Sequence, residues 1–113
     1  MYISYIQVEL NIKDLRVVYA LLIPAAARWL GIATVLNPQL PDGTIAAIQL
    51  NIQGSPNAPQ DGMREMLSTW LKLVRPCKPS WQRLKQAITD SYIPEAQKLS
   101  GKIDNEISKA RRK

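Results

Sequence analysis

The sequence predicts a small all-α protein, and three observations support this class. Apolar residues recur every three or four positions in successive stretches, which is the period of a helix with one buried face. Prolines, glycines and short polar clusters separate these stretches. The apolar-polar alternation of a strand occurs only weakly, in residues 2–10, and no nearby stretch matches it as a pairing partner. We therefore expect six short helices.

Three helices are predicted in the first half of the chain. The first runs from a capping Asn11 to Ile23, and Pro24 breaks it because proline lacks the amide hydrogen and clashes with the preceding turn. Pro24 then suits the first turn of a second helix, residues 24–36. A third helix, residues 44–52, follows a turn-forming cluster and leads into a loop rich in glycine and proline.

Three more helices are predicted in the second half. The fourth is expected to open at Asp61, whose charge favours a helix N-terminus. Pro76 and Pro79 bracket a short connection that neither neighbouring helix can enter. Ser80 is then a good N-cap for the fifth helix, and a sixth apolar stripe extends to Ile103.

Three parts of the chain follow from these elements. Residues 1–10 are expected to be an extended or irregular lead-in, and residues 11–103 the helical domain. Residues 104–113 end in a basic cluster and are expected to form a solvated, fraying tail.

The helical spacing also predicts the core. Large aromatic and aliphatic residues on the apolar faces are expected to pack together, because an aromatic at helical spacing belongs to a core far more often than to a ligand site. The expected core residues are Trp29, Leu36, Ile45, Ile48, Leu67, Trp70, Leu71, Trp81, Leu84, Ile88 and Leu99.

Length and composition narrow the class of protein. A chain of 113 residues with 46% hydrophobic and 21% charged residues is sized for one folded domain. It has a single cysteine and therefore no internal disulfide, which fits a reducing, cytoplasmic compartment. No apolar run approaches the ~20 residues of a membrane span, the longest candidate lying around residues 17–23.

Catalysis is disfavoured by the absence of histidine, because histidine is the commonest general base and metal ligand. No catalytic residue, cofactor or metal site is expected. Cys77 lies between two prolines in a basic stretch, but with no histidine or second cysteine to assist it we interpret it as an ordinary loop residue.

The charges are distributed unevenly. The net charge is +6, yet no lysine or arginine lies between Arg28 and Arg64, whereas residues 72–85 hold five basic residues and no acidic one. A basic helix-turn-helix module that binds nucleic acid is one explanation, and it would direct Gln82, Arg83 and Gln86 at base edges. The stiff, proline-containing connection argues against that motif, and a protein-docking patch or a solvated face remain as alternatives.

The order and spacing of the apolar residues resemble the death domain family over Ile12 to Ile103. The residues that carry the resemblance are Trp29 with Ile32, Ala33 and Leu36; Ile45 with Ile48; the run Met66-Leu67-Ser68-Thr69-Trp70-Leu71; Ser80, Trp81, Leu84, Ala87 and Ile88; and Ala96 with Leu99. The resemblance implies a six-helix antiparallel bundle of Greek-key topology without catalytic activity. It further implies an adaptor that makes homotypic contacts in apoptotic or innate-immune signalling.

The same resemblance implies an interaction surface. In the family, the end of the fourth helix and the loop after it contact the connection between the fifth and sixth helices of another subunit. Here those two sets would be Lys72, Arg75 and Lys78 on one side, and Asp90 and Glu95 on the other. The expected partners are other death-domain proteins or a second copy of this chain, with no nucleic acid and no membrane span.

Overall fold

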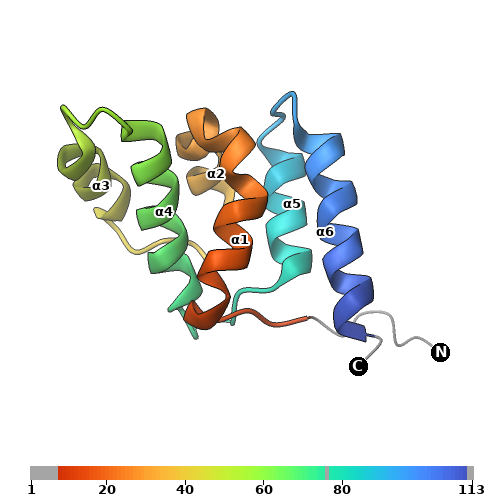
Figure 1. Cartoon of the computed structure of the whole chain (residues 1–113). Coiled ribbons are helices and arrows are strands. Elements are labelled where there is room, and N and C mark those ends of the chain that lie inside the picture. The colour runs from red at the N-terminus through yellow and green to blue at the C-terminus, as the bar shows by residue number, and fades with distance from the viewer. Residues whose placement is uncertain (1–7, 76, 112–113) are drawn as a thin grey trace.

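The computed structural model of the chain describes residues 8–75 and 77–111 (Figure 1). Within them the elements are, in chain order, η1 (Ile12–Asp14), α1 (Leu15–Leu22), η2 (Ile23–Arg28), α2 (Trp29–Val35), α3 (Thr44–Ile52), α4 (Ala58–Leu71), α5 (Trp81–Asp90) and α6 (Ala96–Arg111), where η denotes a 3-10 helix. The only β-type pairing in this part of the chain is a single antiparallel bridge between Glu9 and Ser80. The all-α prediction is confirmed.

The first four elements follow one another without a break. Together they form one helical run from Ile12 to Val35, so the described residues contain five separate helical segments. The predicted break at Pro24 is replaced by a kink in η2, where Ala25 has φ −103° and ψ 15°. Ala25 and Ala26 are both buried, and this packing holds the run together across the proline. The prediction of six separate helices is not confirmed.

The run Ile12–Val35 also corrects an expectation about apolar length. The run has 24 residues and contains an 18-residue window with a mean hydropathy of 1.6, so it is long and apolar enough to cross a membrane by length and composition. The longest apolar stretch is therefore longer than predicted, because the apolar character continues past Pro24. A buried core helix passes the same test, and here Val18, Leu22 and Ile32 are fully buried. We interpret the run as part of the core.

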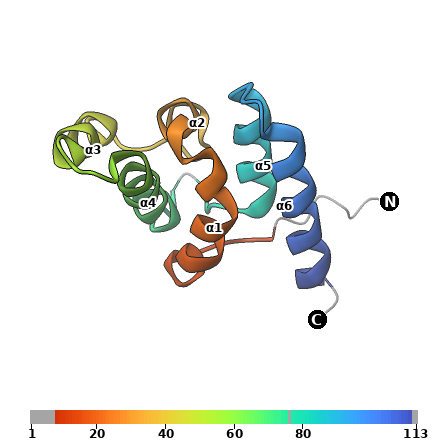
Figure 2. The same ribbon diagram turned by 45° about the horizontal axis from the view of Figure 1, so that its top comes forward.

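The helices lie in a row. From one end of the molecule to the other, Figures 1 and 2 show α3, α4, the α1–α2 run, α5 and α6. α4 packs against α1, α2 and α3, while α5 packs against α2 and α6, and α1 also touches α6. The radius of gyration is 13.8 Å, close to the ~13 Å of a folded domain of about this length.

The residues expected in the core lie inward. Trp70, Leu67, Leu84 and Ile88 are fully buried, and Ile45 is the one member that is only half-buried. The remaining six expected residues, Trp29, Leu36, Ile48, Leu71, Trp81 and Leu99, are at most 7% exposed. The core also takes in residues outside that prediction, including Leu10, Val18, Leu22, Leu40, Met63, Met66, Ile93 and Ile103.

α2 and α4 approach each other closely at one glycine. A Cβ atom added at Gly62 would lie 2.5 Å from Cε2 of the Trp29 indole, which is much closer than real contacts allow. The rigid ring therefore packs directly on the backbone of α4. Any larger residue at position 62 requires the two helices to separate.

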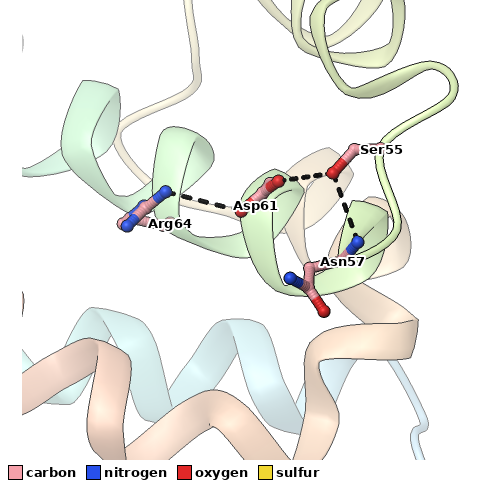
Figure 3. Close-up of polar contacts among 4 residues, drawn as sticks. All are labelled: Ser55, Asn57, Asp61 and Arg64. Carbon is pink, nitrogen blue, oxygen red and sulfur yellow. Dashed lines mark hydrogen bonds and ion pairs between the residues drawn. The ribbon is translucent and has the colours of Figure 1, made fainter.

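α4 begins earlier than predicted. It starts at Ala58, with Pro59 in its first turn, so that Asp61 lies inside the helix. Asp61 accepts a hydrogen bond from Ser55 Oγ at 2.7 Å and lies 3.4 Å from the Arg64 guanidinium (Figure 3). The carboxylate stabilises the helix N-terminus as expected from its charge, but it does so from the first turn and also holds the preceding loop.

The C-terminal end of the predicted domain needs revision, whereas residues 8–10 are extended or irregular as predicted. α6 continues from Ala96 to Arg111, so the fraying tail predicted from residue 104 is wrong for the described residues. The helix continues because Ile107 lies one turn after Ile103 and is also buried, and because Lys85 Nζ bonds Asp104 at 2.8 Å. In the lead-in, residues 1–7 lie outside the described part, and Val8 to Leu10 lie along the start of α5, with Leu10 buried.

Candidate interaction surfaces

The first expected surface surrounds the end of α4 and the connection to α5. Lys72 caps the C-terminus of α4, and Lys72, Arg75 and Lys78 are all exposed. Val74 lies between them in the sequence and is 61% exposed. We call Lys72, Val74, Arg75 and Lys78 the basic loop surface.

Residues 8–10 run alongside this loop, form hydrogen bonds with its backbone and place one carboxylate near its positive charge. The Leu10 amide donates to the Pro79 carbonyl at 2.9 Å, and the Trp81 amide donates to the Val8 carbonyl at 3.1 Å. Lys78 Nζ lies 3.8 Å from a Glu9 carboxylate oxygen, and both side chains are more than half exposed. Part of the positive charge of the basic loop surface is therefore matched within the chain.

The second expected surface is the connection between α5 and α6. Asp90 is the exposed last residue of α5, and its Oδ1 accepts a hydrogen bond from Gln86 Nε2 at 2.8 Å. Glu95 is half-buried, and its Oε1 is buried without a hydrogen-bond partner among the described residues. Between them lies Tyr92, which is 90% exposed and has a φ of +54°. We call Asp90, Tyr92 and Glu95 the acidic loop surface.

The two surfaces lie at opposite ends of α5. The basic loop surface precedes its first turn and the acidic loop surface follows its last, and Figure 1 shows these connections at opposite ends of the helix. The ten residues of α5 separate them by about 15 Å at 1.5 Å per residue. One molecule cannot bring the two together, so any pairing of these charges joins different molecules.

A third surface was not anticipated from the sequence. Helices α1 and α6 border a shallow open groove with a volume of about 770 Å³. Val17, Ala20 and Leu21 of α1 supply its apolar part. Its other lining residues are Arg16, Lys102, Asn105, Glu106 and Lys109, of which Lys109 and Glu106 form an ion pair at 3.3 Å. We call this the α1–α6 groove.

Sequence reasoning missed two exposed apolar residues at the expected surfaces, Val74 and Tyr92. Val74 continues the helical spacing of the apolar face of α4, but α4 ends at Leu71, so Val74 lies in the connection that follows. Tyr92 stands next to the expected break after α5, and an aromatic residue in a polar turn is the signal that could have identified it.

The residues proposed for reading base edges are engaged elsewhere. Gln82 Oε1 accepts a hydrogen bond from the Val8 amide at 2.9 Å, and Gln86 bonds Asp90. Arg83 is half-buried, with its Nε enclosed. These contacts disfavour the insertion of this face of α5 into a DNA groove.

Chemically reactive groups are sparse on these surfaces. Cys77 is half-buried, and its Sγ lies 3.9 Å from Asn37 Oδ1. Across residues 8–75 and 77–111, no three residues of the types His, Cys, Asp and Glu gather as metal ligands would.

No protein-family model matches this chain, and no curated protein and no solved structure matches it either. The functional argument consequently rests on the surfaces described above.

Proposed function

We propose that this chain is a protein-interaction module of the death-domain type that assembles with copies of itself or with related domains. As an adaptor it would transmit apoptotic or innate-immune signals in the cytoplasm without performing catalysis. One observation carries the proposal: surfaces of opposite charge lie at the two ends of α5. The basic loop surface includes the exposed Val74, and the acidic loop surface includes the exposed Tyr92.

The arrangement of the helices supports the six-helix Greek-key part of this proposal. α1 contacts α4 and α6, and α2 contacts α5, although these elements are far apart in the chain. Such neighbours are typical of a bundle whose connections cross over. If the kinked run Ile12–Val35 is counted as two helices divided at η2, the six helices of the family are obtained.

Assembly through unlike surfaces follows from their positions. A contact between the acidic loop surface of one copy and a basic surface of the next is heterologous, and it repeats into a ring or a helical filament. Charge complementarity would steer association and set the register, whereas the apolar side chains would supply most of the affinity.

Nucleic-acid binding by a helix-turn-helix is the alternative, favoured by the net charge of +6. It is the weaker candidate because Gln82 and Gln86 are already hydrogen-bonded within the chain.

The test is sedimentation velocity of the whole chain across a salt series. We expect assemblies at low ionic strength that disperse as salt screens the charges. A gel shift with random duplex DNA at moderate salt serves as the parallel measurement. Tight binding of the duplex would contradict the proposal, and a chain that stays monomeric at every salt concentration would exclude self-assembly and leave related domains as the partners.

A further inference from the structure

Tyr92 has an unusual backbone conformation for its residue type. It occupies the first position after the C-cap of α5, where a left-handed residue ends the helix and glycine is preferred. A bulky residue pays a steric cost at φ +54°, because its Cβ crowds the neighbouring backbone. Strain of this kind persists where the surrounding structure holds it in place, and it occurs often at functional sites.

The exposure of the ring is a second, independent observation. Tyr92 is 90% exposed, so its side chain does not pack in the core of this chain. Burial of the ring therefore does not offset the strain energy of its backbone. Aromatic residues are the commonest anchors of protein interfaces when they enter a recess on the partner. Asp90 and Glu95 flank Tyr92 in the sequence, and Asp90 is exposed, so we describe Tyr92 as an aromatic knob within an acidic segment.

The α1–α6 groove has the complementary features. Its apolar part includes Val17, which is 48% exposed, and the small side chain of Ala20 leaves room above the helix. Arg16, Lys102 and Lys109 border it, opposed only by Glu106. Its volume of about 770 Å³ is large enough for one phenol ring to lie in this shallow, open groove.

The basic loop surface is the poorer receptor for this knob. Its Lys78 already faces Glu9 at 3.8 Å, and its apolar centre is a single valine side chain directed to solvent. The groove offers a recess and two cations, Arg16 and Lys102, that form no ion pair within residues 8–75 and 77–111. The same holds for Lys72 and Arg75 of the basic loop surface, so the recess is the feature that distinguishes the groove.

We propose that the acidic loop surface of one copy docks into the α1–α6 groove of a second copy, with Tyr92 as the anchor. The inference rests on the self-assembly proposed above and names the surface that receives the acidic loop. The groove's residues on α6 run from Lys102 to Lys109, toward the C-terminal end of the helix, whereas Tyr92 precedes its N-terminal end. The contact is therefore head-to-tail, and a pair of copies keeps one free knob on one copy and one free groove on the other.

Charge reversal distinguishes the two possible receptors. Asp90→Lys abolishes assembly in sedimentation velocity at low salt. Both changes are then placed in one chain, where every contact pairs the reversed charges. We expect the Asp90→Lys/Lys102→Glu double variant to assemble again. Asp90→Lys/Arg75→Glu, the matched control with the same net charge, stays monomeric.

Filling the groove provides a test that leaves the charge unchanged. Ala20→Met occupies the space above α1 from an exposed position, and we expect it to weaken self-association by about 30-fold or more, the effect of losing an interface anchor. Circular dichroism confirms that the variant remains folded.

The outcomes separate this inference from the proposed function. If Asp90→Lys/Arg75→Glu assembles and Asp90→Lys/Lys102→Glu does not, the groove is not the receptor, although the chain still self-assembles. Wild-type affinity in Ala20→Met also overturns the inference. A wild-type chain that never assembles overturns the inference together with the self-assembly part of the proposed function, and leaves related domains as the partners.

Discussion

The two connections that flank α5 differ in the exposure of their aromatic residues: the one at the first connection is buried and the one at the second is exposed. The connection before α5 leads to a fully buried Ser80 and to Trp81, which is 5% exposed, and its backbone is hydrogen-bonded to Val8 and Leu10. The connection after α5 carries Tyr92, which is 90% exposed on a left-handed backbone. The first aromatic contributes to folding and the second does not. The difference identifies which connection is available to a partner.

The largest expected effect is at the first connection. Trp81→Ala removes a buried indole from the start of α5, and we expect a loss of about 3–5 kcal/mol of unfolding free energy. A loss of this size is a large fraction of the stability of a small domain. Denaturant titration measures it, and a loss below about 1 kcal/mol would show that Trp81 does not anchor this connection.

The next largest loss of unfolding free energy is expected at Ser80, the N-cap of α5. The Ser80 hydroxyl accepts a hydrogen bond from the Arg83 amide at 3.1 Å, and Ser80→Ala leaves that amide without its partner. We expect a loss of about 0.5–2 kcal/mol in the same titration. Ser108→Ala, at an exposed position in α6, is the control and should change stability by far less.

At the second connection we expect a substitution to raise the unfolding free energy instead of lowering it. Tyr92→Gly replaces a strained residue by the one that suits a left-handed C-terminal position, and we expect a gain of about 0.5–1 kcal/mol. Tyr92→Phe keeps the backbone cost and should match wild type. If Tyr92→Gly were destabilising, the tyrosine would have a structural role that its exposure does not suggest.

The smallest effect concerns the ion pair that links the first connection to the lead-in. Lys78 and Glu9 are 3.8 Å apart and both more than half exposed, so Lys78→Ala should cost less than about 0.5 kcal/mol. Thermal unfolding at low and high salt checks this value. A cost above about 1 kcal/mol would mean that charge, rather than backbone pairing, holds residues 8–10 in place.

The helical class and the buried positions could be predicted from the sequence, because apolar residues at helical spacing lie on one face of a helix and that face is buried. Trp70, Leu84 and Ile88 were identified by spacing alone, and they are fully buried. The break at Pro24 was predicted wrongly because local rules treat proline as a terminator, whereas burial of Ala25 carries the run across it as a kink.

The surfaces were predicted less completely. The basic cluster in residues 72–85 identified Lys72 and Arg75, and the family resemblance identified Asp90, as exposed groups, since charged residues rarely enter a core. The φ of Tyr92 and the α1–α6 groove depend on how a turn closes and on how α1 and α6 pack, and these are tertiary properties. No periodic pattern carries that information.

The central claim is that Tyr92 is retained for binding at a cost to folding. The most direct test measures self-association of wild type and Tyr92→Gly by sedimentation velocity at one low salt concentration, alongside their unfolding free energies. Net charge is the same in both proteins, so screening affects them equally. The account predicts that Tyr92→Gly is the more stable protein and has lost assembly. A Tyr92→Gly protein that assembles as tightly as an assembling wild type would contradict it.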